Sequence, residues 1–71
     1  MDIQKKLGLA IISLRRTAGI SQEEFAKKAN IDRCYMSSIE NGKRQVSVTI
    51  IQRIAEALDV PISRLFLEAE K

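Results

Sequence analysis

The residues best suited to a chemical role lie close together between positions 33 and 38. If this stretch is helical, at about 100° per residue, Ser37 lies about 40° and Cys34 about 100° around the axis from Arg33. Ser38 falls on the same side, so four small or polar side chains share one face. Short side chains permit close approach, and the fork of an arginine matches O6 and N7 of guanine. The spacing therefore predicts a helix face that reads the edges of DNA bases.

Two apolar residues on the opposite side would anchor such a helix. Met36 and Ile39 lie about 300° and 240° from Arg33, which directs them toward a core. An ordinary solvated surface is the alternative for the polar face, but solvated helix faces more often carry Glu and Lys. We therefore expect an anchored helix, from about Arg33 to Asn41, whose polar face is free to enter a groove of DNA.

Capping and stop signals indicate two helices before this stretch. Apolar residues with helical spacing open the chain, and Gly19 follows as a residue that ends helices. Ser21 and Glu24 have the spacing of a capping box, which begins a second helix. Asn30 follows where the chain requires a left-handed residue, a conformation that asparagine tolerates well.

A tight turn then joins this second helix to the one with the polar face, which Asp32 caps. Two short helices in this arrangement predict a helix-turn-helix motif over about residues 21–41. Ala26 is small where the two helices must cross closely. In such a motif one helix lies in the major groove of DNA while the other braces it across the backbone.

Two further helices are expected after a short basic loop. Ser47 is the expected cap of a fourth helix, and Pro61 suits the first turn of a short fifth one. The β-branched run over residues 46–51 resembles a strand locally, but an isolated strand has no partner. The sequence therefore predicts an all-α fold with five helices, in one domain over residues 1–71.

Composition excludes several classes of function. The 71 residues include no His and one Cys, so a His-based acid–base group is absent and a zinc site lacks its preferred ligands. We expect no enzyme, no metal, no cofactor and no small-molecule ligand. No apolar run is long enough to span a bilayer, Asp2 stands where a signal peptide carries positive charge, and Cys34 has no disulfide partner. We therefore expect a soluble, cytoplasmic protein that does not bind membranes.

The charges are distributed unevenly along a chain of net charge +3. Basic residues predominate between positions 27 and 53, whereas acidic residues predominate from position 56 onward. This pattern favours one surface that faces a polyanion and another that is kept away from it. On charge alone, an ordinary solvated surface is an equally good interpretation.

From Gln22 to Val60 the chain resembles the phage Cro and repressor-type helix-turn-helix family, also called the xenobiotic-response-element family. The matching segments are residues 21–26, 30–32, 36–44 and 54–60. The resemblance implies a lambda-repressor-like helix-turn-helix DNA-binding domain and a transcriptional regulator that binds an operator. Residues 31–37, with the Asn-Gly-Lys-Arg that follows, are also similar to controller proteins of restriction–modification systems.

The resemblance implies roles for further residues. Gln22, at the start of the second helix, would contact a phosphate, which agrees with the affinity of helix N-termini for anions. The loop residues Lys43 and Arg44 would follow the DNA backbone or enter the minor groove. An ion pair between Arg15 and Glu40 would join the first helix to the recognition helix. For Gln22 and for the loop, a plain surface position is the alternative.

Three residues carry open questions. Tyr35 lies at the edge of the polar face, where it either donates to a DNA backbone oxygen or packs half-buried. Cys34 stands where the family has a hydroxyl or amide, either as a small contact residue or as a redox sensor. Asn30 replaces the glycine that the family usually has at the turn, and asparagine tolerates the left-handed conformation required there.

One recognition helix covers only a few base pairs, so we expect a homodimer that reads two half-sites about one turn of DNA apart. The fifth helix offers more apolar surface than a small core absorbs, although packing inside the monomer is the alternative. The expected dimerisation region is about residues 48–69, and its interface residues are Thr49, Arg53, Ile62, Leu65 and Phe66. A second class of function is an antitoxin or protein-interaction adaptor with the same fold.

Overall fold

The computed structural model describes residues 2–71, and in this range the chain forms five helices and no strand. The helices are α1 (Ile3–Thr17), α2 (Gln22–Ala29), α3 (Arg33–Glu40), α4 (Val48–Leu58) and α5 (Ile62–Ala69). The predicted all-α, five-helix fold is confirmed. None of these helices is both long and apolar enough to cross a bilayer.

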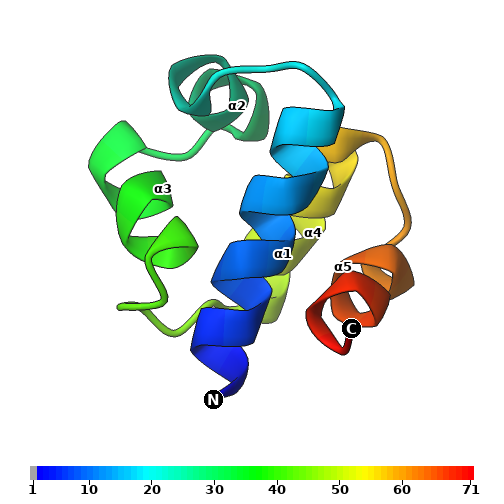
Figure 1. Cartoon of the computed structure of the whole chain (residues 1–71). Helices are drawn as coiled ribbons and strands as arrows, with labels where there is room; N and C mark the ends of the chain where they lie inside the picture. The colour runs from blue at the N-terminus through cyan, green and yellow to red at the C-terminus, as the bar shows by residue number, and fades with distance from the viewer. Residues whose placement is uncertain (1) are drawn as a thin grey trace.

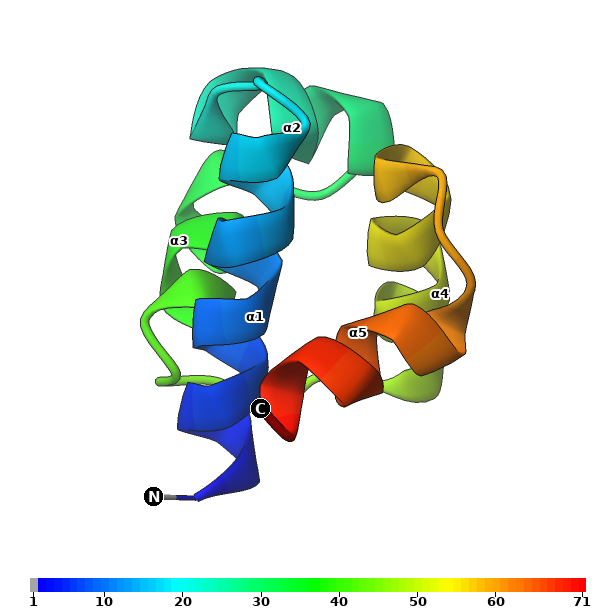
Figure 2. The ribbon, with the colours of Figure 1, turned by 45° about the vertical axis from the view of Figure 1, so that its right-hand side comes forward.

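Helix α1 runs through the middle of the molecule and separates α3 from α5 (Figure 1). It packs against both of them, while α2 packs against α3 and α4. The turned view shows α5 reaching from α4 back to α1, on the side of α1 away from α3 (Figure 2). The helix with the predicted reading face therefore lies at one flank of the molecule and α5 at the other.

Local capping chemistry explains where most of the helices begin and end. The Ser21 hydroxyl accepts from the Glu24 backbone N–H at 3.1 Å, and the Glu24 carboxylate accepts from the Ser21 N–H, so the capping box is present. Asn30 is left-handed with φ 57°, and Gly19 has φ 75° after the end of α1. The Ser47 hydroxyl caps α4 through the Ile50 N–H. These four predictions from the sequence are confirmed.

One helix boundary was not predicted, and another differs from expectation. Asp59 ends α4 in the left-handed conformation with φ 58°, a role that short polar side chains tolerate but that was not predicted. Pro61 is the residue before α5, which starts at Ile62, rather than a member of its first turn. The fixed φ of proline suits both positions, so the sequence did not distinguish them.

Every helix contributes at least one fully buried side chain to the core. These side chains are Ile11, Phe25, Met36, Ile39, Ile54 and Leu65. The expected apolar stripe of α1 enters this core at Leu7, Ile11 and Leu14, but Ile3 is 55% exposed at the start of the helix. A core that connects all five helices holds α3 on a rigid base, although the chain is short.

Two glycines bring the C-terminal end of α3 directly against α1. A Cβ at Gly8, in the interior of α1, would lie 2.6 Å from the backbone oxygen of Glu40 and 2.7 Å from that of Ile39. A Cβ at Gly42, which has φ 72°, would lie 2.8 Å from Cα of Lys5. Both obstacles include backbone atoms, which cannot rotate away. Only glycine allows the two helices to approach this closely.

Gly8→Ala is expected to lower the free energy of unfolding by about 1–3 kcal/mol, the usual cost of overpacking. The clash with the α3 backbone opposes the gain of about 1 kcal/mol that alanine brings in a helix interior. Ser13→Ala, at an exposed position of the same helix, is the matched control and is expected to change stability by less than about 0.5 kcal/mol. Urea titration followed by circular dichroism measures both. A Gly8→Ala protein as stable as wild type would contradict the close approach.

Candidate nucleic-acid interface

Helix α3 presents its polar residues away from the core, as its spacing predicts. Arg33 and Cys34 are exposed in the first turn, while Ser37 and Ser38 are half-buried one turn later. No solvent reaches Met36 on the opposite side, and Ile39 beside it is also buried. The side chains of the first turn therefore protrude furthest. We call Arg33, Cys34, Ser37 and Ser38 together the reading face.

The start of α3 is held by its cap. One carboxylate oxygen of Asp32 accepts from the backbone N–H groups of Cys34 at 2.9 Å and Tyr35 at 3.3 Å. This satisfies two donors that the first turn would otherwise leave unpaired. The cap fixes the backbone from which Arg33 and Cys34 project, so that a partner meets an ordered first turn.

The positive charges next to the reading face have no carboxylate partner in the described part of the chain. Arg33, Lys43 and Arg44 are exposed, and none of them forms an ion pair there. At the other flank, Glu68 pairs with Arg64 at 3.6 Å and with Lys71 at 3.4 Å. Uncompensated positive charge therefore lies on and beside α3, as it does at Lys27 and Arg53 elsewhere on the surface, and it is free to attract an anion.

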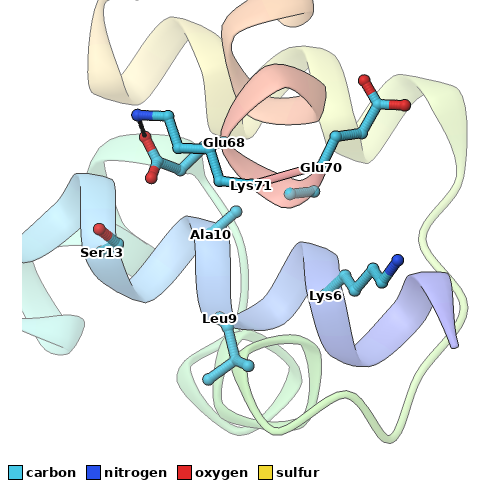
Figure 3. A pocket seen from close by; sticks show the side chains of 8 residues that line it. Lys6, Leu9, Ala10, Ser13, Glu68, Glu70 and Lys71 are labelled. Carbon is cyan, nitrogen blue, oxygen red and sulfur yellow. Dashed lines mark hydrogen bonds and ion pairs between the residues drawn. The ribbon is translucent and has the colours of Figure 1, made fainter. Parts of the chain in front are cut away.

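The contact between Lys71 and Glu68 borders a groove between α1 and the end of α5 (Figure 3). The groove has a volume of about 440 Å³, and its lining includes Leu9 and Ala10 of α1 together with cationic and anionic side chains. Because α1 separates this groove from the reading face, the two features belong to different sides of the molecule (Figures 1 and 2).

Tyr35 packs half-buried against the core, which is one of the two roles left open for it. Its ring also lies beneath the guanidinium group of Arg44, 5.0 Å from the guanidinium carbon to the ring centroid. The loop after α3 is thus in contact with the first turn of α3. Sequence reasoning did not predict this contact, because the two residues are separated by the rest of α3 and a turn.

Glu40 at the end of α3 joins three helices. The residue is 4% exposed. Its carboxylate accepts two hydrogen bonds from Arg15 of α1, Nε–Oε2 at 2.9 Å and Nη2–Oε1 at 3.1 Å. Arg15 also donates to the backbone oxygen of Ile20 at 3.1 Å. The ion pair implied by the family resemblance is thus present in the structure. Its fork geometry is the strong form of an arginine–carboxylate contact.

The side chain of Gln22 has a partner that sequence reasoning missed. Its Nε2 donates to Oε1 of Glu40 at 3.0 Å, so the amide group is held inside the protein. Gln22 is the first residue of α2, and the N-terminus of that helix remains the part suited to a phosphate. The side-chain amide of Gln22 is therefore occupied within the protein, and a phosphate contact at the N-terminus of α2 stays a prediction.

The expected dimer interface needs one correction. Leu65 is fully buried inside the monomer, where it belongs to the core, so it offers no surface to a second copy. Thr49 and Arg53 are exposed on α4, Ile62 is 40% exposed, and Phe66 is half-buried on α5. On a short amphipathic helix, the residue that points most directly inward packs into the core of the monomer. The sequence alone did not show which apolar residue of α5 has that position.

Comparison with known proteins identifies the motif. The helix-turn-helix family matches residues 11–65, which include the C-terminal part of α1, all of α2, α3 and α4, and the first half of α5. The chain belongs to the helix-turn-helix family. The resemblance to Cro and repressor-type proteins is thereby confirmed. In this helix-turn-helix protein, α2 and α3 are the two helices of the motif that gives the family its name.

Its relatives among transcriptional regulators include controller proteins. The chain is 42% identical over 71 residues to the control protein C.MunI of a Mycoplasma species, covering 99% of this chain and 96% of that one. It is 38% identical to the restriction–modification controller protein C.AhdI of Aeromonas hydrophila, with a TM-score of 0.87 over 89% of this chain and 96% of that one. The clp gene regulator ClgR of Corynebacterium glutamicum is 26% identical with a TM-score of 0.94, and the match covers 99% of this chain and 74% of that one. The narrower similarity to controller proteins is therefore also confirmed.

Proposed function

We propose that this helix-turn-helix regulator is a cytoplasmic, controller-type protein that binds a palindromic operator as a homodimer. The observation that carries the proposal is the reading face, anchored from behind by Met36 and Ile39 and flanked by the unpaired cations Lys43 and Arg44. Side chains on the face read base edges in the major groove, while the loop cations bind phosphates. The protein acts by occupying DNA, without catalysis.

Selection of bound duplexes from a random pool tests this function directly. The expected result is enrichment of an inverted repeat whose half-sites lie about one turn of DNA, roughly 34 Å, apart. Affinity for the recovered duplex is expected to fall steeply as salt is raised, because phosphate contacts release counterions. Absence of binding in low salt would overturn the proposed function, and an enriched site without symmetry would overturn the homodimer on a palindrome.

Exposed apolar side chains support dimerisation through α4 and α5. Val48 of α4 is 78% exposed, and on α5 Ile62 is 40% and Leu67 58% exposed. Exposed apolar side chains that recur on neighbouring helices are typical of surfaces that a second copy covers. A two-fold axis at this flank leaves the reading face of each copy free for DNA.

Ile62→Glu is expected to shift the protein from dimer to monomer, because it places a charge in the proposed interface. Sedimentation equilibrium at tens of micromolar measures the change. Thr17→Glu is the control, since it introduces the same charge at an exposed position in the last turn of α1, outside the proposed interface. Wild-type protein that sediments only as a monomer would refute the dimer, and equal effects of both variants would refute the assigned surface.

A further inference from the structure

The loop after α3 carries a cation that rests on the recognition helix. The guanidinium carbon of Arg44 lies 5.0 Å from the centroid of the Tyr35 ring, within the range of a cation–π interaction. Tyr35 is half-buried against the core, so its ring is held in place from below. Arg44 is exposed, and its guanidinium carbon lies over the ring.

Arg44 is free of competing polar contacts. Within residues 2–71 its guanidinium group forms no ion pair and no hydrogen bond with another side chain. Its donors are therefore available to an external anion, while its orientation is restricted by the ring. A long arginine side chain in a loop normally loses much rotational freedom when it binds, and stacking removes part of that loss in advance.

We propose that Tyr35 is a positioning residue for Arg44, and that the pair binds a phosphate of the DNA backbone as one unit. The inference rests on the proposed function, because the anion it names is part of the DNA duplex. Tyr35 acts through its ring rather than its hydroxyl group. The loop cation is thereby aligned with the reading face before DNA arrives.

The stacking is testable in the free protein. Side-chain protons of Arg44 in wild type are expected at upfield NMR shifts, because they lie over an aromatic ring. The shifts are expected to persist in Tyr35→Phe, which keeps the ring, and to disappear in Tyr35→Leu. Ordinary arginine shifts in the wild-type protein would overturn the inference without any DNA-binding measurement.

A double-mutant cycle tests the coupling on DNA. The probe is the fluorescently labelled duplex recovered with wild-type protein from the random pool, and circular dichroism melting verifies that each variant is folded. Tyr35→Leu is expected to weaken binding about two- to fivefold in the wild-type background, the size of an exposed cation–π contact. In the Arg44→Gln background the same change is expected to have almost no further effect, and Tyr35→Phe is expected to bind like wild type.

The salt dependence separates positioning from a merely structural role. Arg44→Gln removes one phosphate contact and is expected to lower the slope of log affinity against log salt by about one. Tyr35→Leu changes no charge, yet it is expected to lower the slope in the same direction because Arg44 is no longer aligned. Additive losses in the cycle, or an unchanged slope in Tyr35→Leu, would overturn the inference while leaving DNA binding intact. Wild-type protein that binds no duplex would overturn both this inference and the proposed function.

Discussion

Replacing Glu40 with alanine is expected to lower the free energy of unfolding by about 3 kcal/mol or more and to weaken DNA binding at the same time. The substitution leaves Arg15, whose side chain is only 12% exposed, without the carboxylate that accepts its two bonds. It also releases the amide of Gln22. For a domain of this size the loss corresponds to a fall in melting temperature of about 12 °C or more.

Binding is expected to weaken because Glu40 ends α3 and joins it to α1 and α2. Without this contact the three helices are less strictly oriented, so the reading face and the N-terminus of α2 no longer meet DNA in fixed relative positions. Thermal melting and binding to the selected duplex measure the two effects. Unchanged melting together with unchanged affinity would contradict this role for Glu40.

A matched control is available at the other flank. Glu68→Ala also removes a glutamate with two cationic partners, but Arg64 and Lys71 are 45% and 66% exposed in their side chains. Exposed pairs of this kind contribute about 0–1 kcal/mol, so the control is expected to melt close to wild type. If Glu40→Ala unfolds too far for binding measurements, Glu40→Gln keeps the shape and two of the acceptor contacts in weaker form. It is expected to show an intermediate loss of about 1–2 kcal/mol.

Arg33→Ala is expected to relax sequence preference at one base position of each half-site. Arg33 is exposed in the first turn of α3, and its fork is the group on the reading face that matches guanine. Loss of a bidentate contact costs about 1–3 kcal/mol, roughly 5- to 150-fold in affinity for the preferred site. Selection from the random pool, repeated with the variant, measures the change in preference.

Comparison with Lys43→Ala distinguishes contacts that recognise base sequence from contacts that only bind phosphate. Lys43 lies in the loop beyond α3 and is expected to bind phosphate, which carries no sequence information. The variant is expected to weaken binding to all duplexes alike and to lower the salt slope by about one. An Arg33→Ala protein that selects the same sites as wild type would show that Arg33 does not read a base.

Features that depend on local chemistry were predictable from the sequence. The capping box of Ser21 and Glu24, the left-handed Asn30 and the cap at Asp32 each involve residues a few positions apart, so their geometry follows from short-range hydrogen bonding. The outward direction of Arg33 likewise follows from helical periodicity. The ion pair of Arg15 was available only through the family resemblance, because its two residues lie 25 positions apart.

The close approach of α1 and α3 is indicated by one residue of the sequence, although it was not predicted. Gly8 stands in the interior of an otherwise regular helix, where glycine costs about 1 kcal/mol relative to alanine. A glycine at such a position often marks a close approach of another backbone. The signal indicates that something approaches, but the sequence alone does not show that it is the end of α3.

The sequence by itself determined the five helices, the caps at Ser21, Asn30, Asp32 and Ser47 and the polar face of α3, because each depends on neighbours along the chain. Only the tertiary structure decided that Gln22 donates to Glu40, that Arg44 lies over Tyr35 and that Leu65 is absorbed by the core. These contacts join residues that are distant in sequence. Their geometry depends on how the helices cross, and side-chain packing across the whole core sets those crossings.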